Sequence, residues 1–348
     1  MATAGAVRVT LKQVAEVAGV SVMTASYAYN RPERVSQQAR TRVLAAAARL
    51  GYAGPDPSAR ALRRGSSNTL AVVLGEHLSY AFDDPGAVSF MAGVADVCAA
   101  EGTGMLIVPI TGGDDDITRV TDAAADGFIV WTTTDDDPVL AAVRATRRPA
   151  VLHGSPTSRH LLGVSIDNRA AARAVGTLAF AHARRPAVLS QPLDRSRIST
   201  ISTGADPARV PFPVTRERLI GFRQAAEDAD VAWDRVLVAV CSRNSMEEAE
   251  AAARTLLTQP EPPDAIAAMS DEQAIGVLHA ARTLGLRVPD DVALTGFDDL
   301  PAATQYELTT VTQSLREQGT TCARIALGLP VPRKRPPWSV VQRTTTRT

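Results

Sequence analysis

The apolar residues of this 348-residue chain recur with two different spacings. Between residues 10 and 51 the spacing is helical, beginning with Leu11, Val14, Ala15 and Ala18, which would share one face of a helix. From Thr69 onward, short and nearly continuous apolar runs alternate with longer stretches of helical pattern. Such runs are typical of parallel strands that helices cover on both faces. The pattern therefore predicts an all-α head followed by an α/β body.

Two helices and a turn are predicted at the start of the head. Thr10 and Gln13 have the spacing of a capping box, which satisfies free backbone N–H groups, so a helix is expected to begin at Leu11. Gly19 then supplies a turn, and Ser21 is placed to cap a second helix.

A third helix is expected from about Ser36, with Gly51 as its end. Its inward positions would be Val43, Leu44, Ala47 and Leu50. Three short helices with a glycine-containing turn between the first two are typical of a helix-turn-helix module.

The residues on the outward face of the second helix indicate which kind of partner this module binds. Ala25 and Ala28 would pack inward, whereas Met23, Tyr27 and Asn30 would lie on the opposite side between hydroxyl-bearing residues. Such a face suits a DNA major groove, where side chains touch base edges and hydroxyls reach phosphates. The alternative is a three-helix bundle whose Met23 and Tyr27 meet another protein.

The formal net charge of zero hides a division along the chain. Residues 1–65 carry ten basic and three acidic side chains, a net +7, and residues 331–348 carry five basic and no acidic ones. The remaining residues have a net charge of −12. A cationic head on an anionic body is expected of a nucleic-acid-binding protein with a sensing body. On charge alone, a solvated basic tail explains the head equally well.

The body is expected to form two Rossmann-like subdomains, because its β/α units exceed one open sheet. A boundary is expected near Gly163, with further crossings near Pro301 and, in the C-terminal tail, near Arg335. Ligands in such sheets bind beyond the carboxyl ends of the strands, here between the lobes. The predicted strands are residues 70–74, 105–108, 128–131, 150–152, 187–189, 236–240, 266–269 and 292–295.

Candidate ligand-binding residues follow several of these strands. Asp271 follows one strand and would also cap a helix, Arg218 is read as starting a helix, and Asp167 could equally be a turn residue. Tyr80 and Phe82, after the first strand, are weaker candidates that could simply pack, as is Trp131. The remaining acidic clusters are interpreted as a structural turn at Asp298–Asp299 and solvated loops at 114–116 and 135–137.

Several classes of protein are excluded by what the sequence lacks. No apolar run reaches the length of a membrane span, and the N-terminus lacks a secretory signal. Three distant cysteines, Cys98, Cys241 and Cys322, favour a reducing cytoplasm. No enzyme motif, cofactor fingerprint or metal-ligand spacing is present, so we expect no catalysis, cofactor or metal. A periplasmic-type binding protein remains the competing class, against which the cationic head counts.

The sequence resembles the lactose repressor/galactose repressor (LacI) family over nearly its whole length. The matching positions are Val9 to Ala15, Ala18 to Ser26, Asn30, Arg34 to Ser36, Leu50 to Tyr52 and Ala59 to Leu62. The resemblance implies a dimeric, ligand-controlled regulator, most often a repressor, that binds a pseudo-palindromic operator. Its domains would be residues 1–54 for DNA binding, 55–68 for a hinge and 69–348 for effector binding and dimerisation.

The resemblance also assigns DNA-contacting residues. Val22, Met23 and Tyr27 would read bases, and the backbone contacts and supporting positions would be Leu11, Ser21, Thr24, Ser26, Asn30 and Ser36. In the hinge, Leu62 would wedge between base pairs in the minor groove, beside Ala59 and Arg60. Most family members have arginine at Tyr27, and tyrosine cannot make the bidentate contact of arginine with guanine.

In the body, the resemblance places Asp167, Arg218 and Asp271 in the effector pocket. Arginine and aspartate on opposite walls can bind vicinal hydroxyls of a sugar through charge-assisted hydrogen bonds. The effector would be a small polar molecule of sugar or nucleoside type.

Overall fold

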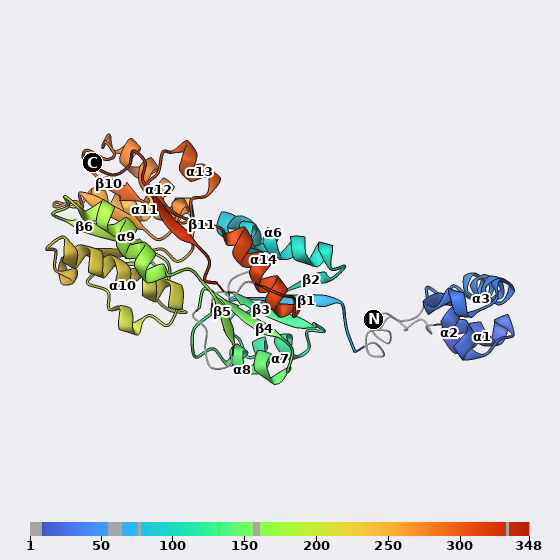
Figure 1. Cartoon of the computed structure of the whole chain (residues 1–348). Coiled ribbons are helices and arrows are strands. Elements are labelled where there is room, and N and C mark those ends of the chain that lie inside the picture. The colour runs from blue at the N-terminus through green and yellow to red at the C-terminus, as the bar shows by residue number, and fades with distance from the viewer. Residues whose placement is uncertain are drawn as a thin grey trace, which may run out of the picture. The chain divides into compact units, whose positions relative to one another are not determined.

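The computed structural model describes residues 9–54, 65–75, 78–131, 133–155, 161–331 and 334–347. The chain divides into two compact units, Met1–Ser67 and Asn68–Thr348, called the head and the body below (Figure 1). The expected hinge contacts Ala59, Arg60 and Leu62 lie outside the described residues.

The described residues of the head form three α-helices and one short 3₁₀ turn. Thr10 and Gln13 form the predicted capping box, in which the Thr10 backbone N–H donates to Gln13 Oε1 at 2.8 Å. Gly19 ends the first helix with φ +62°, a left-handed conformation that favours glycine. The elements are α1 (Leu11–Ala18), α2 (Val22–Asn30), η1 (Pro32–Arg34) and α3 (Gln37–Leu50).

A small core of alanine and valine holds these helices together. Leu44 was expected to point inward, but it is 41% exposed, because α3 directs its neighbours Val43, Ala46 and Ala47 toward the other helices instead. The buried side chains are Val14, Ala15, Ala18, Ala25, Ala28, Val43, Ala46 and Ala47.

The first lobe of the body is a five-stranded parallel sheet in the order β2-β1-β3-β4-β5. Alternate residues of each strand face opposite helical layers, one containing α6 and α14 and the other α7 and α8. Its strands are β1 (Thr69–Leu74), β2 (Gly104–Pro109), β3 (Gly127–Trp131), β4 (Ala150–His153) and β5 (Leu162–Val164). Its helices are α5 (Tyr80–Asp83), α6 (Pro85–Ala100), α7 (Asp116–Thr121), α8 (Pro138–Ala145) and, from late in the chain, α14 (Leu315–Ala326).

The second lobe repeats this architecture with the strand order β10-β9-β6-β8-β7, in which the edge strand β7 is antiparallel. Helices α9 and α10 cover one face of the sheet, and α11 and α12 cover the other. Its strands are β6 (Pro186–Ser190), β7 (Thr200–Thr203), β8 (Leu237–Val240), β9 (Ala265–Ala268) and β10 (Ala293–Thr295). Its helices are α9 (Asn168–Phe180), η2 (Pro207–Arg209), α10 (Pro213–Asp228), η3 (Trp233–Arg235), α11 (Met246–Leu257), α12 (Asp271–Thr283) and α13 (Pro301–Gln305).

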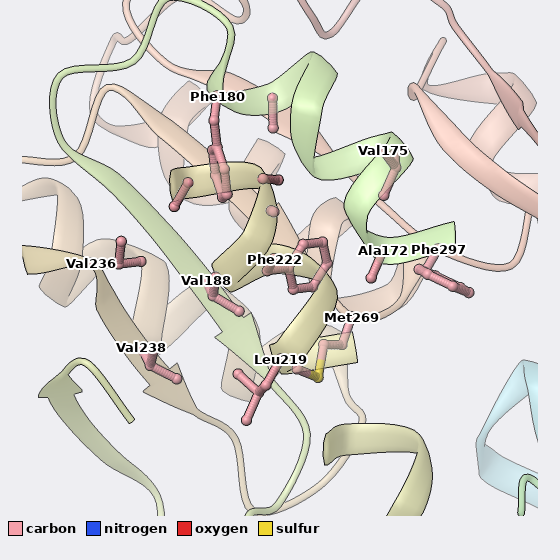
Figure 2. Packing of buried hydrophobic residues seen from close by; sticks show 14 of the residues in the cluster. Ala172, Val175, Phe180, Val188, Leu219, Phe222, Val236, Val238, Met269 and Phe297 are labelled. Atoms are coloured by element: carbon pink, nitrogen blue, oxygen red, sulfur yellow. The ribbon is translucent and has the colours of Figure 1, made fainter. Parts of the chain in front are cut away.

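The core of the second lobe lies between its sheet and the pair α9–α10. Figure 2 shows Phe222 and Leu219 of α10 beside Val188 of β6, with Phe180 at the end of α9. The two helices approach closely because Gly221 faces α9, where an added Cβ would lie 2.4 Å from the carbonyl oxygen of Arg169. The predicted fold class, a helical head with two parallel α/β subdomains, is therefore confirmed.

The chain passes between the two lobes of the body at three places. The first follows β5, and α9 begins in the second lobe at Asn168. A crossing was expected near Pro301, but α13 stays in the second lobe, and the chain leaves it only between β11 (Thr310–Gln313) and α14. In Figure 1, α14 lies beside α6 of the first lobe. The chain then returns to form β12 (Trp338–Val341), which pairs with β11 in an antiparallel ladder.

The basic C-terminal segment is bound to the second lobe. Arg343 donates to the carbonyl oxygen of Leu308 at 2.7 Å and to Asp299 at 2.8 Å. Arg347 donates to the carbonyl oxygens of Pro289, Asp264 and Asp290. Arg343 and Arg347 thus bind one carboxylate and four backbone carbonyl oxygens of the second lobe.

The described residues contain no disulfide, no helix suited to span a membrane and no cluster of metal-binding side chains. Cys98, Cys241 and Cys322 are buried and unpaired, and burial raises the pKa of the Cys241 thiol to about 12. No helix among the described residues has the length and hydropathy that a membrane span requires. Groups of acidic, histidine and cysteine side chains suited to a metal ion are likewise absent from the parts described.

Candidate functional site

The exposed face of α2 carries the candidate base-reading residues. Met23 is 64% exposed, Val22 is also exposed and Tyr27 is half-buried, whereas Ala25 and Ala28 are buried against the other helices. Two apolar side chains of this size on the surface of a small polar domain are typical of a contact surface.

The hydroxyl groups around this face hold the helix ends. Ser21 caps α2 by accepting from the Thr24 backbone N–H at 3.0 Å, and Ser36 caps α3 in the same way. Asn30 donates from Nδ2 to the carbonyl oxygen of Ser26 at 3.1 Å and to its hydroxyl at 3.3 Å. Leu11, the remaining candidate, is half-buried at the start of α1. The polar candidates thus lie within α2 or at the N-terminal ends of α2 and α3.

A cavity of about 110 Å³ lies in the body at the interface of its two lobes. It receives residues from the carboxyl ends of β3, β4, β6 and β8 and from two of the three lobe crossings, the one after β5 and the one between β11 and α14. This position is expected for paired open α/β sheets. The residues that line it include Tyr80, Asp84, Trp131, His153, Asn168, Phe212, Arg218, Asn244, Asp298, Gln313 and Gln318.

Arg218 forms one wall of the cavity and is almost fully buried. It lies in the second turn of α10, not at the helix start as expected, because the helix already begins at Pro213. Its Nε donates to Asn168 Oδ1 at 3.0 Å, one of its terminal nitrogens donates to the carbonyl oxygen of Met269, and its Cζ stacks 3.6 Å from the centre of the Phe297 ring. These contacts hold the guanidinium in one orientation.

Asp298 lies beside Arg218, with Oδ1 at 3.6 Å from Nη2 of the arginine. The sequence interpretation assigned Asp298 a purely structural role in a turn. Its backbone does have a left-handed φ of +112°, but the residue also lines the cavity, so that interpretation is incomplete. Burial raises the pKa of Asp298 to about 6, against the opposing effects of Arg218 and of a hydrogen bond from Gln313. Its neighbour Asp299 pairs with Arg343 and does have a structural role.

His153 lines the cavity from the end of β4. Its ring lies 4.5 Å from Phe90 and 4.8 Å from Trp131, between centroids, and Nε2 is 3.1 Å from Gln318 Oε1. Burial, reinforced by the positive charge of Arg218, lowers the pKa of His153 to about 4. The imidazole is therefore neutral at physiological pH.

The two lobes also meet through Asp84, which caps α6. Its Oδ1 accepts from the Ala87 backbone N–H at 2.6 Å, and its Oδ2 accepts from Asn244 Nδ2 of the second lobe. Burial raises the pKa of Asp84, and the hydrogen bonds from Ala87, Asn244 and Tyr80 oppose that shift.

Three of the five candidate effector residues are not among those that line the cavity. Asp271 is fully buried and accepts from Thr310 Oγ1 at 2.6 Å and from the Leu300 backbone N–H at 2.8 Å, so it ties α12 to β11. Asp167 caps α9 and pairs with Arg335 at 2.9 Å on the surface. Phe82 is 68% exposed on the short helix α5. Only Tyr80 and Arg218 of the five line the cavity.

An acidic loop that was expected to be solvated forms ion pairs with the other lobe. Asp137 caps α8, accepts from Thr133 Oγ1 at 2.6 Å and pairs with Arg195 of the other lobe at 3.2 Å. Asp135 pairs with Arg216 at 2.8 Å. The first acidic cluster is also partly structural, since Asp116 is buried and accepts from the backbone. The sequence pattern alone could not show which lobe these carboxylates face.

Many cavity residues were not candidates in the sequence interpretation, and among the polar ones are Asp84, His153, Asn168, Asn244, Gln313 and Gln318. Many of them share one available signal, since they end a strand or stand at the start of a helix. The same kind of position is occupied by Asp167 and Asp271, which do not line the cavity. Position alone therefore identifies candidates but does not separate cavity residues from the others.

Two family profiles match separate parts of the chain. Residues 10–54 match the lacI family of bacterial regulatory proteins, and residues 197–347 match the periplasmic binding protein-like domain. A helix-turn-helix transcriptional regulator of Mycobacterium tuberculosis is 37% identical over 338 residues, 93% of each chain. The helix-turn-helix transcriptional regulator IpsA of Corynebacterium glutamicum is 33% identical over 317 residues, 89% of this chain and 88% of its own.

Solved structures share both the head and the body. A LacI-family transcriptional regulator from Corynebacterium glutamicum superposes with a TM-score of 0.72 and 30% identity, over 97% of this chain and 98% of that one. The lac repressor dimer bound to operator and to the anti-inducer ONPF has a TM-score of 0.72 and 25% identity, over 98% and 100% of the two chains. A complex of the regulator CelR with cellobiose has a TM-score of 0.64 and 25% identity, over 97% and 100%.

Proposed function

Because the chain belongs to the LacI family of bacterial regulatory proteins, we propose that it is a homodimeric repressor whose operator affinity is controlled by a small polar effector. It is a helix-turn-helix transcriptional regulator and not an enzyme.

The surface of α2 carries the DNA-binding part of the proposal. Val22, Met23 and Tyr27 would contact bases, since Val22 and Met23 are exposed on this helix and Tyr27 is only half-buried. Ser21, Thr24, Ser26, Asn30 and Ser36 would support phosphate contacts, and Leu11 would abut the backbone. Two heads on a two-fold dimer would read a pseudo-palindromic operator, with Leu62 of each hinge in the minor groove.

The cavity between the lobes carries the effector part. Arg218 can donate to a ligand hydroxyl and Asp298 can accept from one, while Trp131 and Phe212 supply apolar surface. Such a lining suits a sugar or a nucleoside, which presents hydroxyl groups around an apolar ring face. A ligand that touches both lobes would change their relative position, and through the hinges the spacing of the two heads.

The test is operator selection with the full chain, followed by binding in the presence of candidate effectors. We expect selection from random DNA to return a pseudo-palindrome whose affinity falls steeply with salt. Cellobiose, ribose, adenosine and cytidine would then be titrated in a fluorescence anisotropy assay, and one compound class should change operator affinity. Salt-insensitive binding without sequence preference would overturn the DNA-binding role.

A matched pair of variants separates DNA contact from folding. Met23→Glu places a carboxylate against the phosphates and should reduce operator affinity by at least tenfold, with an unchanged melting temperature. Ile117→Glu makes the same exchange at an exposed apolar residue of the body and should leave operator affinity unchanged. Equal losses in both variants would show that α2 is not the contact surface.

A further inference from the structure

A chain of side-chain hydrogen bonds connects the two walls of the effector cavity. His153 Nε2 lies 3.1 Å from Gln318 Oε1, Gln318 Nε2 donates to Gln313 Oε1 at 2.9 Å, and Gln313 Nε2 donates to Asp298 Oδ1 at 2.6 Å. Asp298 in turn faces Arg218. His153 belongs to the first lobe and Asp298 to the second, and the two glutamines flank the crossing between β11 and α14.

This hydrogen-bond chain has a fixed donor-to-acceptor direction, because the chemistry of Asp298 at one end determines it. An ionised Asp298 can only accept, so Gln313 must present its amide NH₂ group to it and its carbonyl to Gln318. Gln318 must then donate to Gln313 and present its own carbonyl to His153. His153 Nε2 must therefore carry the proton, which leaves Nδ1 as the acceptor of the ring.

Reversal of a single link would leave like groups facing each other. Gln318 is 2% exposed, so bulk solvent does not replace a lost partner at that position. The orientation of each amide is thus tied to the charge of Asp298.

The charged groups around Asp298 place it close to a change of protonation. Arg218 favours its ionised form, whereas burial and the nearby carboxylate of Asp84 favour the neutral form. The buried carboxyl of Asp271 also repels it, and Asp299 lies next to it but is held by Arg343. Against these opposing influences, the hydrogen bond from Gln313 holds the carboxylate in its ionised form.

We propose that Gln313 and Gln318 are positioning residues that keep Asp298 ionised and oriented toward the effector, and that set the tautomer of His153 to match. The inference rests on the proposed function in that Asp298 is taken to contact the effector. It deepens that function by naming the ligand class. The carboxylates that line the cavity, Asp84 and Asp298, are matched in number by the guanidinium groups of Arg197 and Arg218, and His153 is neutral. This balance suits an uncharged polyhydroxylated ligand that donates to Asp298 and His153 Nδ1.

The hydrogen-bond chain is tested without any effector, by ¹⁵N NMR of the histidine imidazoles in the full-length protein. His153 is identified as a ring that stays neutral at pH 5 and whose signals vanish in His153→Gln. We expect the Nε2–H tautomer to dominate at pH 7.5 and its population to fall toward pH 5, as Asp298 becomes protonated and able to donate. A dominant Nδ1–H tautomer at pH 7.5 would overturn the proposal.

Variants along the chain show whether His153 reports on Asp298. In Asp298→Asn and Gln318→Leu, the pH dependence of the His153 tautomer should disappear, whereas Gln191→Leu, at another lining position, should leave it intact. If Gln318→Leu does not fold, Gln318→Glu is used. Its carboxylate still accepts from His153 but cannot donate to Gln313, so the Nε2–H form should persist at all pH values.

An unchanged pH dependence in Asp298→Asn would contradict the coupling. Because these spectra involve neither DNA nor ligand, failure of the hydrogen-bond chain is distinguishable from failure of the proposed regulatory function. The ligand class is tested separately in the anisotropy assay, where glucose should act at lower concentration than glucose 6-phosphate. A stronger effect of the phosphorylated sugar would overturn the assignment to uncharged ligands.

Discussion

Asn244 of the second lobe donates a hydrogen bond from Nδ2 to Oδ2 of Asp84 in the first lobe. The same asparagine accepts from Ser270, which caps α12, while Asp84 caps α6. The pair therefore connects the N-terminal ends of two helices from different lobes through one buried polar contact.

Removal of this contact should destabilise the body. Asn244→Ala removes the hydrogen bond that Asn244 donates to the buried Asp84 carboxylate and the one that it accepts from the Ser270 hydroxyl, and the loss of a hydrogen bond to a buried charged group costs about 1–3 kcal/mol. We expect the free energy of unfolding to fall by about that amount in urea titrations. Arg223→Ala, which breaks an exposed pair with Glu227, should change it by less than about 0.5 kcal/mol. Equal effects would mean that the interlobe bond contributes nothing.

The operator should differ from common family sites at the base pair that faces Tyr27. Tyrosine lacks the paired donors with which arginine recognises guanine, so selection with the wild-type chain should return no guanine preference there. Tyr27→Arg should gain that preference, with a discrimination of about 1–3 kcal/mol between guanine and the other bases. Selection of the usual guanine by the wild type, unchanged in Tyr27→Ala, would refute this assignment.

The stability of the body should depend on pH through Asp298. Its folded-state pKa is raised from an ordinary value of 3.8 to about 6. Protonation therefore favours the folded state, and this contribution is complete below about pH 4 and is lost as the pH rises through 6. Asp298→Asn should remove about 2–3 kcal/mol of that pH dependence between pH 4 and 7, measured as the difference between the two proteins in thermal or urea unfolding. Parallel pH profiles for wild type and variant would contradict it.

The arginines of the basic C-terminal segment should contribute unequally to the stability of the body. Arg343 is largely buried and donates to Leu308 and Asp299, so Arg343→Met should lower the free energy of unfolding by about 2–4 kcal/mol, because Asp299 is left without its counter-charge. Arg335→Met breaks a more exposed pair with Asp167 and should cost less than about 1 kcal/mol.

The comparison between these two variants is the decisive one, because both remove one positive charge from the same segment. Differential scanning calorimetry should show a clearly lower melting temperature only for Arg343→Met. Similar melting temperatures would mean that the segment is bound by its backbone and not by Arg343.

Local sequence was sufficient to predict those structural features that depend on neighbouring residues alone. The capping box of Thr10 and Gln13, the caps at Ser21 and Ser36 and the left-handed Gly19 were predicted at the residues where they occur, because each involves at most a few consecutive positions. The buried strands were predicted for the same reason, since a strand covered on both faces must be apolar throughout.

The cavity was not predictable in this way. Asp271 and Asp298 both follow strands of the second lobe, and nothing near either residue in the sequence distinguishes them. The structure separates them because Asp271 points back toward Thr310 and Leu300, while the left-handed backbone of Asp298 turns its side chain toward Arg218.

The sequence by itself determined the head, the class of body and the family, because caps, periodicity and motif spacing are properties of short segments. Which polar residues share the cleft depends on the tertiary fold, because Gln318 meets His153 across 165 residues of sequence and Gln313 reaches His153 only through Gln318. Such contacts depend on where the chain crosses between the lobes, and β11 and α14 set that crossing through long-range packing.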